Sequence, residues 1–400
     1  MAFQTAKEAA DRLGVTVRAI QKWAKEGRLD GAKKVGRDWM IPKEAVDALL
    51  PEEKKTHPPT EAQMPVRTYY DSNAMLLMNG EYPGRFSDYI ETLPDQTERE
   101  LARAEYDYFT GNPQSAADLA EKHLNAEAYY QRYTASFIYL FANLTLERNH
   151  LASLTLENIA KKSRAKAKEH PDRRIRFTAA YTLSALSVLF HIGTDKTTHV
   201  KEFLRPLSGG NKVFACYLWC QKAYLEKRYD RAYAVADTVL AFVAKEYPLA
   251  HIYLELIAAA VQINLQNREL AREHLLRAHT LAKKENFIQP FAEHRRMLQG
   301  LMEVELRKED PAFLTQVLAL SAPFEKSWSL LHNGLTNRTI TDQLTVTEFN
   351  IAMLYHRGWR MKAIADHLEL SERTVKNYLH NVYGKLQINS RRDLEDYLLC

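Results

Sequence analysis

The sequence predicts a mostly α-helical protein with a compact unit at each end and a long helical region between them. Apolar residues recur at intervals of three and four over most of the chain, which is the period of an amphipathic helix. Alternating, strand-like stretches are scarce, and the two ends share one spaced pattern of residues. The chain has 400 residues, 46% of them hydrophobic and 26% charged, so it can form several packed units.

The first compact unit is expected over residues 1–50. A capping box, Thr5-x-x-Glu8, opens its first helix, and a second helix is expected over residues 17–25. Gly27 ends that helix, and residues 32–42 predict a small hairpin. Residues 51–66 predict an extended linker, because four prolines between Pro51 and Pro65 leave no room for a helix or strand.

Residues 67–335 predict pairs of helices joined by short polar turns. The turns are marked by Asn112, Asn149, Asp195, Asp230 and Asn267, at intervals of 37, 46, 35 and 37 residues. This period is typical of helix-hairpin solenoids, in which each hairpin buries its apolar face against its neighbours.

The clearest of these units, residues 223–240, resembles a tetratricopeptide repeat. Its small Ala223, Ala232 and Ala236 predict a close approach of paired helices. The other units are degenerate, so an irregular helical bundle remains the alternative. The resemblance implies a sensor or interaction domain for an unidentified small-molecule, peptide or protein effector. The region is rich in tyrosine, and tyrosine side chains on a concave surface of the repeats would suit binding of a peptide or protein.

The two ends carry the same pattern at an offset of 355 residues. Ala10 and Ala365 are each followed by a leucine after three residues and by a hydroxyl residue after six, Thr16 and Ser371. A β-branched residue stands ten positions after each alanine. This spacing is typical of a helix-turn-helix, in which the hydroxyl residue caps the second helix.

The C-terminal unit, residues 341–400, resembles the LuxR-type DNA-binding domain, a four-helix helix-turn-helix. The resemblance rests on Leu344-Thr345-x-x-Glu348, Gly358, Ile364-Ala365-x-x-Leu368, Ser371-x-x-Thr374-Val375-Lys376, Lys385-Leu386 and Ser390-Arg391. It implies that the helix from about Glu372 to Leu386 lies in the major groove of double-stranded DNA, and that the last helix, with Leu394, Tyr397 and Leu398, forms a homodimer contact.

The spacing along this helix separates two faces. Arg373, Lys376, Asn377 and His380 share a polar face, and Val375, Leu379, Val382 and Leu386 share an apolar one. Lysine and asparagine can bond the edges of guanine and adenine, so the candidates for base reading are Lys376, Asn377 and His380. The candidates for phosphate contacts are Thr374, Lys385 and Arg391.

The N-terminal unit resembles the excisionase or MerR-like winged helix-turn-helix. The resemblance implies that Trp23 and Ile20 fill the core and that two sets of residues face DNA. The candidates for the groove are Thr16, Arg18, Gln21, Lys22 and Lys25, and those on the wing are Lys33, Lys34 and Arg37. The linker replaces the long dimerisation helix of MerR regulators, so this unit binds either DNA, beside the C-terminal domain, or protein.

Enzymes are not favoured by the sequence. It contains no GxGxxG, Walker, HExxH or GxSxG motif, and Cys216 and Cys220 predict buried packing rather than a metal site. No cofactor is therefore expected. Three cysteines, no secretory leader and no apolar span favour the cytoplasm and no membrane partner.

The sequence as a whole favours a bacterial-type, sequence-specific transcription regulator. DNA-binding units at both ends would be controlled by an effector on the helical repeats. The net charge of only +5 does not by itself indicate DNA, so this reading depends on local arrangement. The alternative is an interaction scaffold that uses the repeats, with the N-terminal unit as a docking piece.

Overall fold

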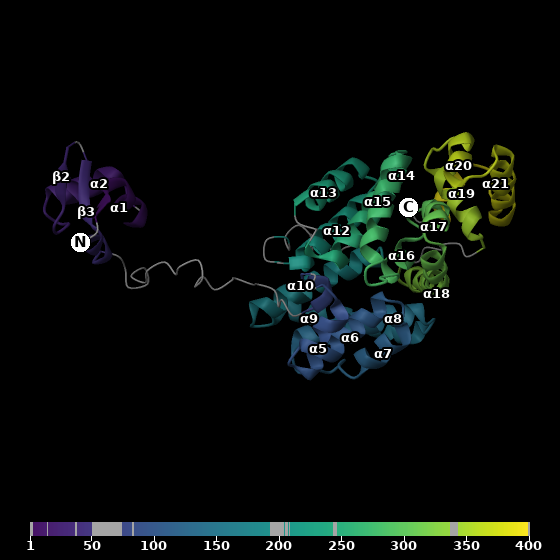
Figure 1. Cartoon of the computed structure of the whole chain (residues 1–400), viewed down its shortest axis with the longest axis horizontal. Helices are drawn as coiled ribbons and strands as arrows, with labels where there is room; N and C mark the ends of the chain where they lie inside the picture. The colour runs from purple at the N-terminus through teal and green to yellow at the C-terminus, as the bar shows by residue number, and fades with distance from the viewer. Residues whose placement is uncertain are drawn as a thin grey trace. The chain divides into compact units, whose positions relative to one another are not determined.

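A computed structural model of the chain describes residues 3–13, 15–36, 38–49, 74–81, 84–192, 204, 207, 209–242, 246–336 and 343–398. The chain divides into two compact units, Met1–Arg67 and Thr68–Cys400, which are treated separately below. Helices make up most of the described chain (Figure 1), which confirms the predicted fold class. The predicted linker, residues 51–66, lies outside the described residues.

The N-terminal unit combines three helices with a three-stranded antiparallel sheet. In chain order the elements are β1 (Phe3–Thr5), α1 (Ala6–Leu13), α2 (Val17–Lys25), β2 (Lys33–Val35), β3 (Asp38–Pro42) and α3 (Lys43–Asp47). The central strand is β3, which pairs with β1 on one side and β2 on the other.

Small residues let the two main helices of this unit cross closely. Ala9 and Ala10 on α1 are buried with Ile20 on α2, and Ile41 of β3 closes the core. The structure therefore confirms the predicted helix, turn, helix and hairpin. The strand β1 is not predicted by the sequence, because three residues give too short a pattern to recognise.

Helices fill the described part of the second unit up to residue 336. They are α4 (Leu76–Asn79), α5 (Phe86–Thr92), α6 (Gln96–Phe109), α7 (Pro113–Glu121), α8 (Tyr129–Thr145), α9 (Asn149–Glu169), α10 (Arg173–Leu189), α12 (Gly209–Leu225), α13 (Tyr229–Phe242), α14 (Pro248–Asn264), α15 (Arg268–Ala282), α16 (Gln289–His294), α17 (Leu301–Glu309) and α18 (Pro311–Thr336). We call residues 74–336 the hairpin region.

Five helix ends in the hairpin region share one geometry. Each has a residue with positive φ just after the helix, followed by an amide that donates to the carbonyl five residues back. The positive-φ residues are Gly111, Glu147, His191, Lys227 and Gln266. This is the Schellman motif, which satisfies the last carbonyls of a helix. Four of the five predicted turns are confirmed, and the marker Asp195 lies outside the described residues.

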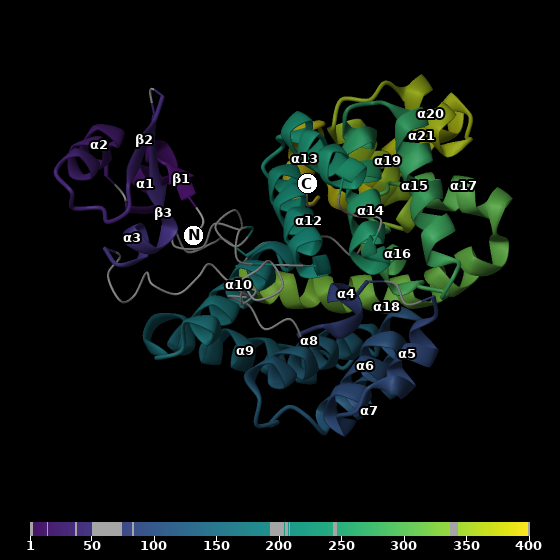
Figure 2. The same ribbon diagram turned by 60° about the vertical axis from the view of Figure 1, so that its left-hand side comes forward.

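The hairpin region is not an open solenoid, because hairpins also contact helices far along the chain. Glu285, after α15, accepts a hydrogen bond of 2.9 Å from the amide of Phe86 at the start of α5. Gly111 lies against Ile288 and Leu320, and α18 packs on both α8 and α16. Figure 2 shows α18 running between the earlier and later hairpins.

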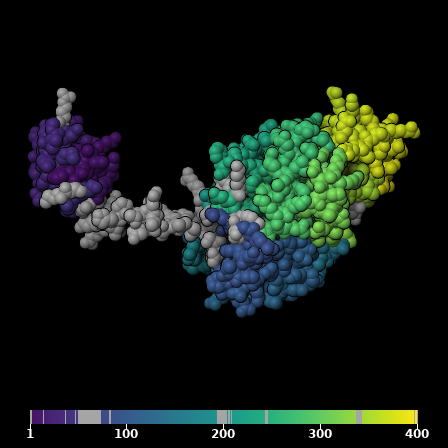
Figure 3. All heavy atoms as spheres, viewed as in Figure 1, coloured from purple at the N-terminus to yellow at the C-terminus, as the bar shows by residue number. Residues whose placement is uncertain are grey.

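The chain ends in four helices, α19 (Val346–His356), α20 (Met361–Leu368), α21 (Glu372–Leu386) and the 3-10 helix η4 (Arg392–Asp396). We call residues 343–398 the C-terminal head. Phe349, Val382 and Leu394 belong to a small core within it, whereas Trp359 and Ile364 join the core of the hairpin region. The head therefore packs directly on the hairpins, as the space-filling view shows (Figure 3).

Candidate nucleic-acid interface

The helix α21 is capped and orientated as the sequence predicts. The hydroxyl of Ser371 accepts a hydrogen bond of 3.1 Å from the amide of Thr374, which satisfies one free amide at the helix start. The apolar face is buried, and the opposite polar face is exposed. Its exposed residues are Arg373, Lys376, Asn377 and His380. Because its apolar face is packed in the core, this helix presents its polar side chains for contact with a groove of DNA.

The turn before α21 has a residue in the left-handed region. Glu369 ends α20 with φ 55°, and the amide of Leu370 donates to the carbonyl of Ala365 over 2.9 Å. Glycine adopts this conformation without strain, whereas glutamate does so at a cost of about 1–2 kcal/mol. The carboxylate of Glu369 also forms an ion pair with Lys308 of α17, which ties the turn to the hairpin region.

The three predicted phosphate contacts all have partners within the head. The hydroxyl of Thr374 lies 2.7 Å from that of Ser371, and the guanidinium of Arg391 lies 4.7 Å from the ring centre of Tyr355. Lys385 donates a hydrogen bond of 2.6 Å to Glu348.

Glu348 has two structural roles in the head. Its backbone amide and carboxylate complete the predicted capping box with Thr345 at the start of α19, and its carboxylate also accepts the Lys385 bond. Burial opposes the charge of Glu348, but the bonds from Lys385 and Thr345 outweigh it and hold the pKa of this carboxyl below its ordinary value. Lys385 therefore secures α21 against α19 as well as carrying charge.

In the N-terminal unit, the predicted groove residues lie on one exposed helix. The hydroxyl of Thr16 accepts a hydrogen bond of 3.3 Å from the amide of Ala19, which confirms the cap. The other predicted residues on α2 are exposed: Arg18, Gln21, Lys22 and Lys25. The core prediction is confirmed for Ile20, which is fully buried, whereas Trp23 is half-buried beneath the Arg28 guanidinium.

The predicted wing is the hairpin of β2 and β3. Lys33 and Lys34 are exposed on β2, and the ammonium of Lys33 lies 4.3 Å from the ring centre of Phe3. Arg37 lies outside the described residues. The capping box of this unit is present, since the Thr5 amide donates to Glu8 over 2.7 Å and the Glu8 amide donates to Thr5 over 3.3 Å.

Polar contacts hold the head on the hairpin region, and the sequence does not predict them. Arg357, after α19, bonds the hydroxyl of Tyr224 over 2.8 Å and also contacts Asn264. His367 of α20 lies 3.2 Å from the carbonyl of Gln299. These partners are 68 to 133 residues apart, and nothing in a single sequence links residues over such distances. None of the four polar residues on the exposed face of α21 takes part.

The residues expected at a dimer contact are largely inside the head. Leu394 is fully buried and Leu398 nearly so, both in the small core formed with α19 and α21, while Tyr397 is half-buried. Glu395 of the same segment bonds Lys227 of the hairpin region over 3.1 Å. The two leucines are therefore not on a surface that a second copy could reach.

The two cysteines singled out in the sequence, and the buried His274, have structural surroundings. Cys216 and Cys220 are buried as predicted, and burial raises the pKa of both thiols, that of Cys216 to about 11. His274 lies 2.5 Å from a carboxylate oxygen of Glu255. Within the described residues there is no cluster of three metal-ligating side chains, and no described helix is long and apolar enough to span a bilayer.

The fold and the exposed basic helix place the chain in the class of helix-turn-helix DNA-binding proteins. Residues 5–53 match the family model of a helix-turn-helix domain. Residues 342–398 match that of bacterial regulatory proteins of the luxR family. The chain thus has a DNA-binding domain of this class at each end, as predicted, and is a DNA-binding transcriptional regulator. Comparison of the chain with curated proteins and with solved structures finds no match.

Proposed function

We propose that this protein is a sequence-specific regulator whose C-terminal head reads DNA and whose hairpin region receives the controlling signal. The observation that carries the proposal is the face of α21. Lys376, Asn377 and His380 are exposed together on a helix whose other face is fixed in the core. Bidentate contacts of such side chains with base edges discriminate by about 1–3 kcal/mol each.

The phosphate contacts are proposed to come from α21, from the loop that follows it, and from the wing of the N-terminal unit. Thr374, Lys385 and Arg391 remain the candidates in the head, and Lys33 and Lys34 in the N-terminal unit. Lys385 keeps 40% of its side chain exposed beside Glu348, so it can bond a phosphate without leaving its place. Contacts of this kind make affinity fall as salt rises.

The N-terminal unit is proposed to act as an auxiliary DNA-binding domain. A single small module buries little surface and binds weakly alone, but a tether raises its effective concentration near the site of the head. The exposed residues Arg18, Gln21, Lys22 and Lys25 support this role. Protein docking by the same face is the alternative, and truncation separates the two.

Selection of bound sequences from a random duplex library tests the proposal. The full-length protein is compared with a version lacking residues 1–65, which removes the first compact unit. We expect a shared motif from the head, extended in the full-length protein if the N-terminal unit also reads DNA. No enrichment with either protein at low salt would overturn the regulator proposal and leave the interaction scaffold.

A double substitution in α21 provides the sharper measurement. Lys376→Ala with Asn377→Ala is expected to lower affinity for the selected duplex at least tenfold and to abolish preference over a scrambled duplex. The matched control is Lys161→Ala with Lys162→Ala on the exposed face of α9, which is expected to change neither. Fluorescence anisotropy at several salt concentrations measures both quantities. An unchanged preference of the α21 variant for the selected duplex over the scrambled duplex would refute base reading by this helix.

Paired half-sites in the selected motif would require a dimer on DNA. Leu394 and Leu398 are buried, so a dimer contact at the last helix would use the exposed Arg392 and Glu395 and the half-buried Tyr397. Sedimentation of the protein with and without the selected duplex measures its oligomeric state.

A further inference from the structure

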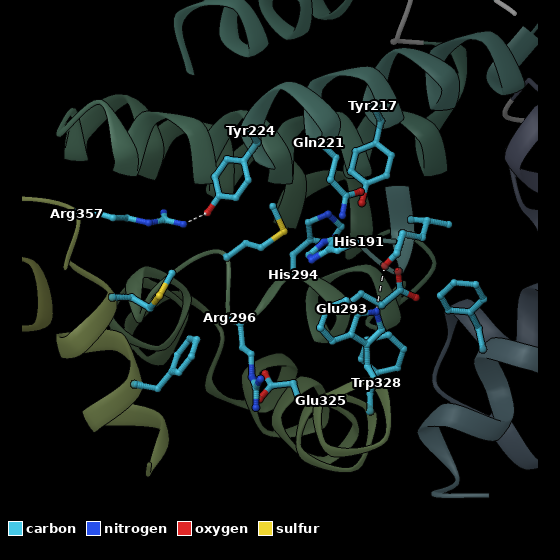
Figure 4. Close-up of a pocket in the computed structure, with 16 residues that line it drawn as sticks. His191, Tyr217, Gln221, Tyr224, Glu293, His294, Arg296, Glu325, Trp328 and Arg357 are labelled. Carbon is cyan, nitrogen blue, oxygen red and sulfur yellow. Dashed lines mark hydrogen bonds and ion pairs between the residues drawn. The ribbon is translucent and has the colours of Figure 1, made fainter. Parts of the chain in front are cut away.

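A cavity lies where the C-terminal head meets the hairpin region. Its walls come from α8, α10, α12, α16 and α18 of the hairpins and from α19 of the head, and its empty space is about 840 Å³ including the open mouth. Most of the lining is apolar and aromatic, from Phe141, Phe324 and Trp328 on one side to Phe349 and Met353 of α19 on the other. Figure 4 shows the polar side chains that project between these walls.

Five buried polar atoms at this cavity have no hydrogen-bond partner. Two are Nδ1 of His191 and the donor Nε of Arg357, and three are acceptors. The first belongs to His294, whose Nδ1 lies 2.7 Å from the carbonyl oxygen of Pro290. Burial lowers the pKa of His294 to about 4, so the ring is neutral, its proton sits on Nδ1, and Nε2 is a free acceptor. The amide oxygen of Gln221 and Oε1 of Glu325 are the other two. His294 and Gln221 are 1% and 5% exposed.

The carboxyl groups of the wall already have hydrogen-bond partners. Arg296 bonds Glu325 over 3.2 Å and Ser329 over 2.9 Å. Glu293 accepts hydrogen bonds from the hydroxyls of Tyr108 and Tyr253, and burial raises its pKa to about 7. Arg357 bonds only neutral groups, the hydroxyl of Tyr224 and the side chain of Asn264. A cation entering this space would therefore lose its hydration without gaining an unpaired negative charge.

We propose that the cavity binds a planar aromatic molecule without positive charge that carries at least one N–H or O–H donor. The aromatic walls fit a flat ring, and the three unfilled acceptors fit its donors. Each buried acceptor that gains a partner recovers free energy that is lost while it is buried without one. The further assignment of this molecule as the controlling effector rests on the regulator function proposed above.

The cavity also explains how such a molecule would act on the head. Phe349, Met353 and Arg357 belong to the head, and the remaining wall residues belong to the hairpins. A ligand that touches both sides binds only while the head is packed on the hairpins, so it stabilises that arrangement. The ligand would therefore control whether the head stays packed on the hairpin region or separates from it.

The experiment compares two molecules of the same shape by isothermal titration calorimetry on the full-length protein. Indole carries an N–H donor, and benzofuran replaces it with an oxygen that cannot donate. Indole is expected to bind at least tenfold more tightly. Gln221→Leu is expected to weaken indole binding about tenfold and to leave benzofuran binding unchanged, because one acceptor is lost. Gln316→Leu, on the exposed face of α18, is the matched control and is expected to change neither.

Two results would overturn the inference. Equal affinities for indole and benzofuran would show that the unpartnered acceptors do not contribute to binding. No heat of binding with either molecule at millimolar concentration would show that the cavity is not a binding site for such rings. Should Gln221→Leu fail to fold by circular dichroism, the comparison of the two ligands on the unaltered protein decides alone. Binding of indole by a protein that selects no DNA sequence would instead contradict the proposed function and leave the site intact.

Discussion

At the scale of single residues, buried carboxyls decide how the hairpin region responds to pH. Glu105 on α6 is fully buried and accepts bonds of 3.1 Å and 2.7 Å from the amides of Leu77 and Met78 at the start of α4. Burial raises its pKa from 4.5 to about 7, although both amide bonds lower it. Glu105 thus supplies the cap that α4 lacks in its own sequence.

We expect Glu105 to make the protein less stable as pH rises. The folded protein holds this proton more tightly than the unfolded chain, so its stabilisation is complete below about pH 4.5 and is lost towards pH 7. The loss amounts to roughly 3 kcal/mol. Glu105→Gln stays uncharged and should remove this part of the pH dependence. At pH 5 the substitution is expected to lower the free energy of unfolding by about 1–3 kcal/mol, because the side-chain NH2 group of glutamine cannot accept the hydrogen bond from one of the two backbone amides.

Urea unfolding followed by circular dichroism at pH 5 and pH 7.5 measures the effect. The difference between the two proteins isolates Glu105 from other titrating groups such as Glu293. The same fall in unfolding free energy in both proteins would contradict the assignment.

The exposure of the candidate DNA-contact residues on α21 was predictable from the sequence, but the intramolecular partners of the other candidates were not. The exposed and buried faces of α21 follow from helical spacing alone. The contacts of Lys385 with Glu348, Arg391 with Tyr355 and Lys33 with Phe3 depend on how distant elements pack. A local pattern contains no information on such packing.

At the scale of elements, the recurring turn is the feature that the sequence reveals best. Polar residues at regular intervals predicted the hairpins, because a turn is encoded within a few residues. The long-range contacts of α18 with α8 and α16, which close the hairpin region, were not predictable, since they join surfaces with no common sequence pattern. The hairpins are therefore joined also by contacts between helices far apart in the sequence.

One of these turns offers a stabilising substitution. Gln266 follows α14 with φ 59° and is exposed, so its side chain gains nothing from a conformation that costs about 1–2 kcal/mol. Gln266→Gly is expected to raise the free energy of unfolding by about 1 kcal/mol. Lys161→Gly, in the interior of α9, should instead lower it by about 1 kcal/mol. The urea midpoint distinguishes these outcomes, and a loss of stability in both variants would show that the turn is unstrained.

At the scale of the whole molecule, the head and the hairpins form one hydrophobic core. The sequence separates residues 341–400 from residues 67–335, yet Trp359 and Ile364 of the head are buried in the same cluster as hairpin residues such as Leu298 and Leu301. The predicted boundary itself, residues 336–340, lies outside the described residues except for Thr336. A helix-turn-helix pattern identifies a domain but not the surface on which it packs.

Differential scanning calorimetry should detect this shared core. We expect the head to unfold together with the hairpins in one transition, and removal of residues 1–65 to leave that transition in place. Trp359→Ala is expected to lower its temperature, because loss of a buried aromatic side chain costs about 3–5 kcal/mol. An additional low-temperature transition that belongs to residues 343–398 would show that the head unfolds independently.

The seam between α17 and α20 has a consequence for protein engineering. Gly300 has φ 87° and lies so close to Leu368 that no side chain fits between them, and Lys308 pairs with Glu369 a short distance away. A chimera that grafts another helix-turn-helix of the same kind onto this hairpin region would therefore have to carry Leu368, Glu369 and Arg357 with it. The exposed face of α21, which we propose to read DNA, can be exchanged residue by residue. The buried side of the head can be exchanged only together with the hairpin surface on which it packs.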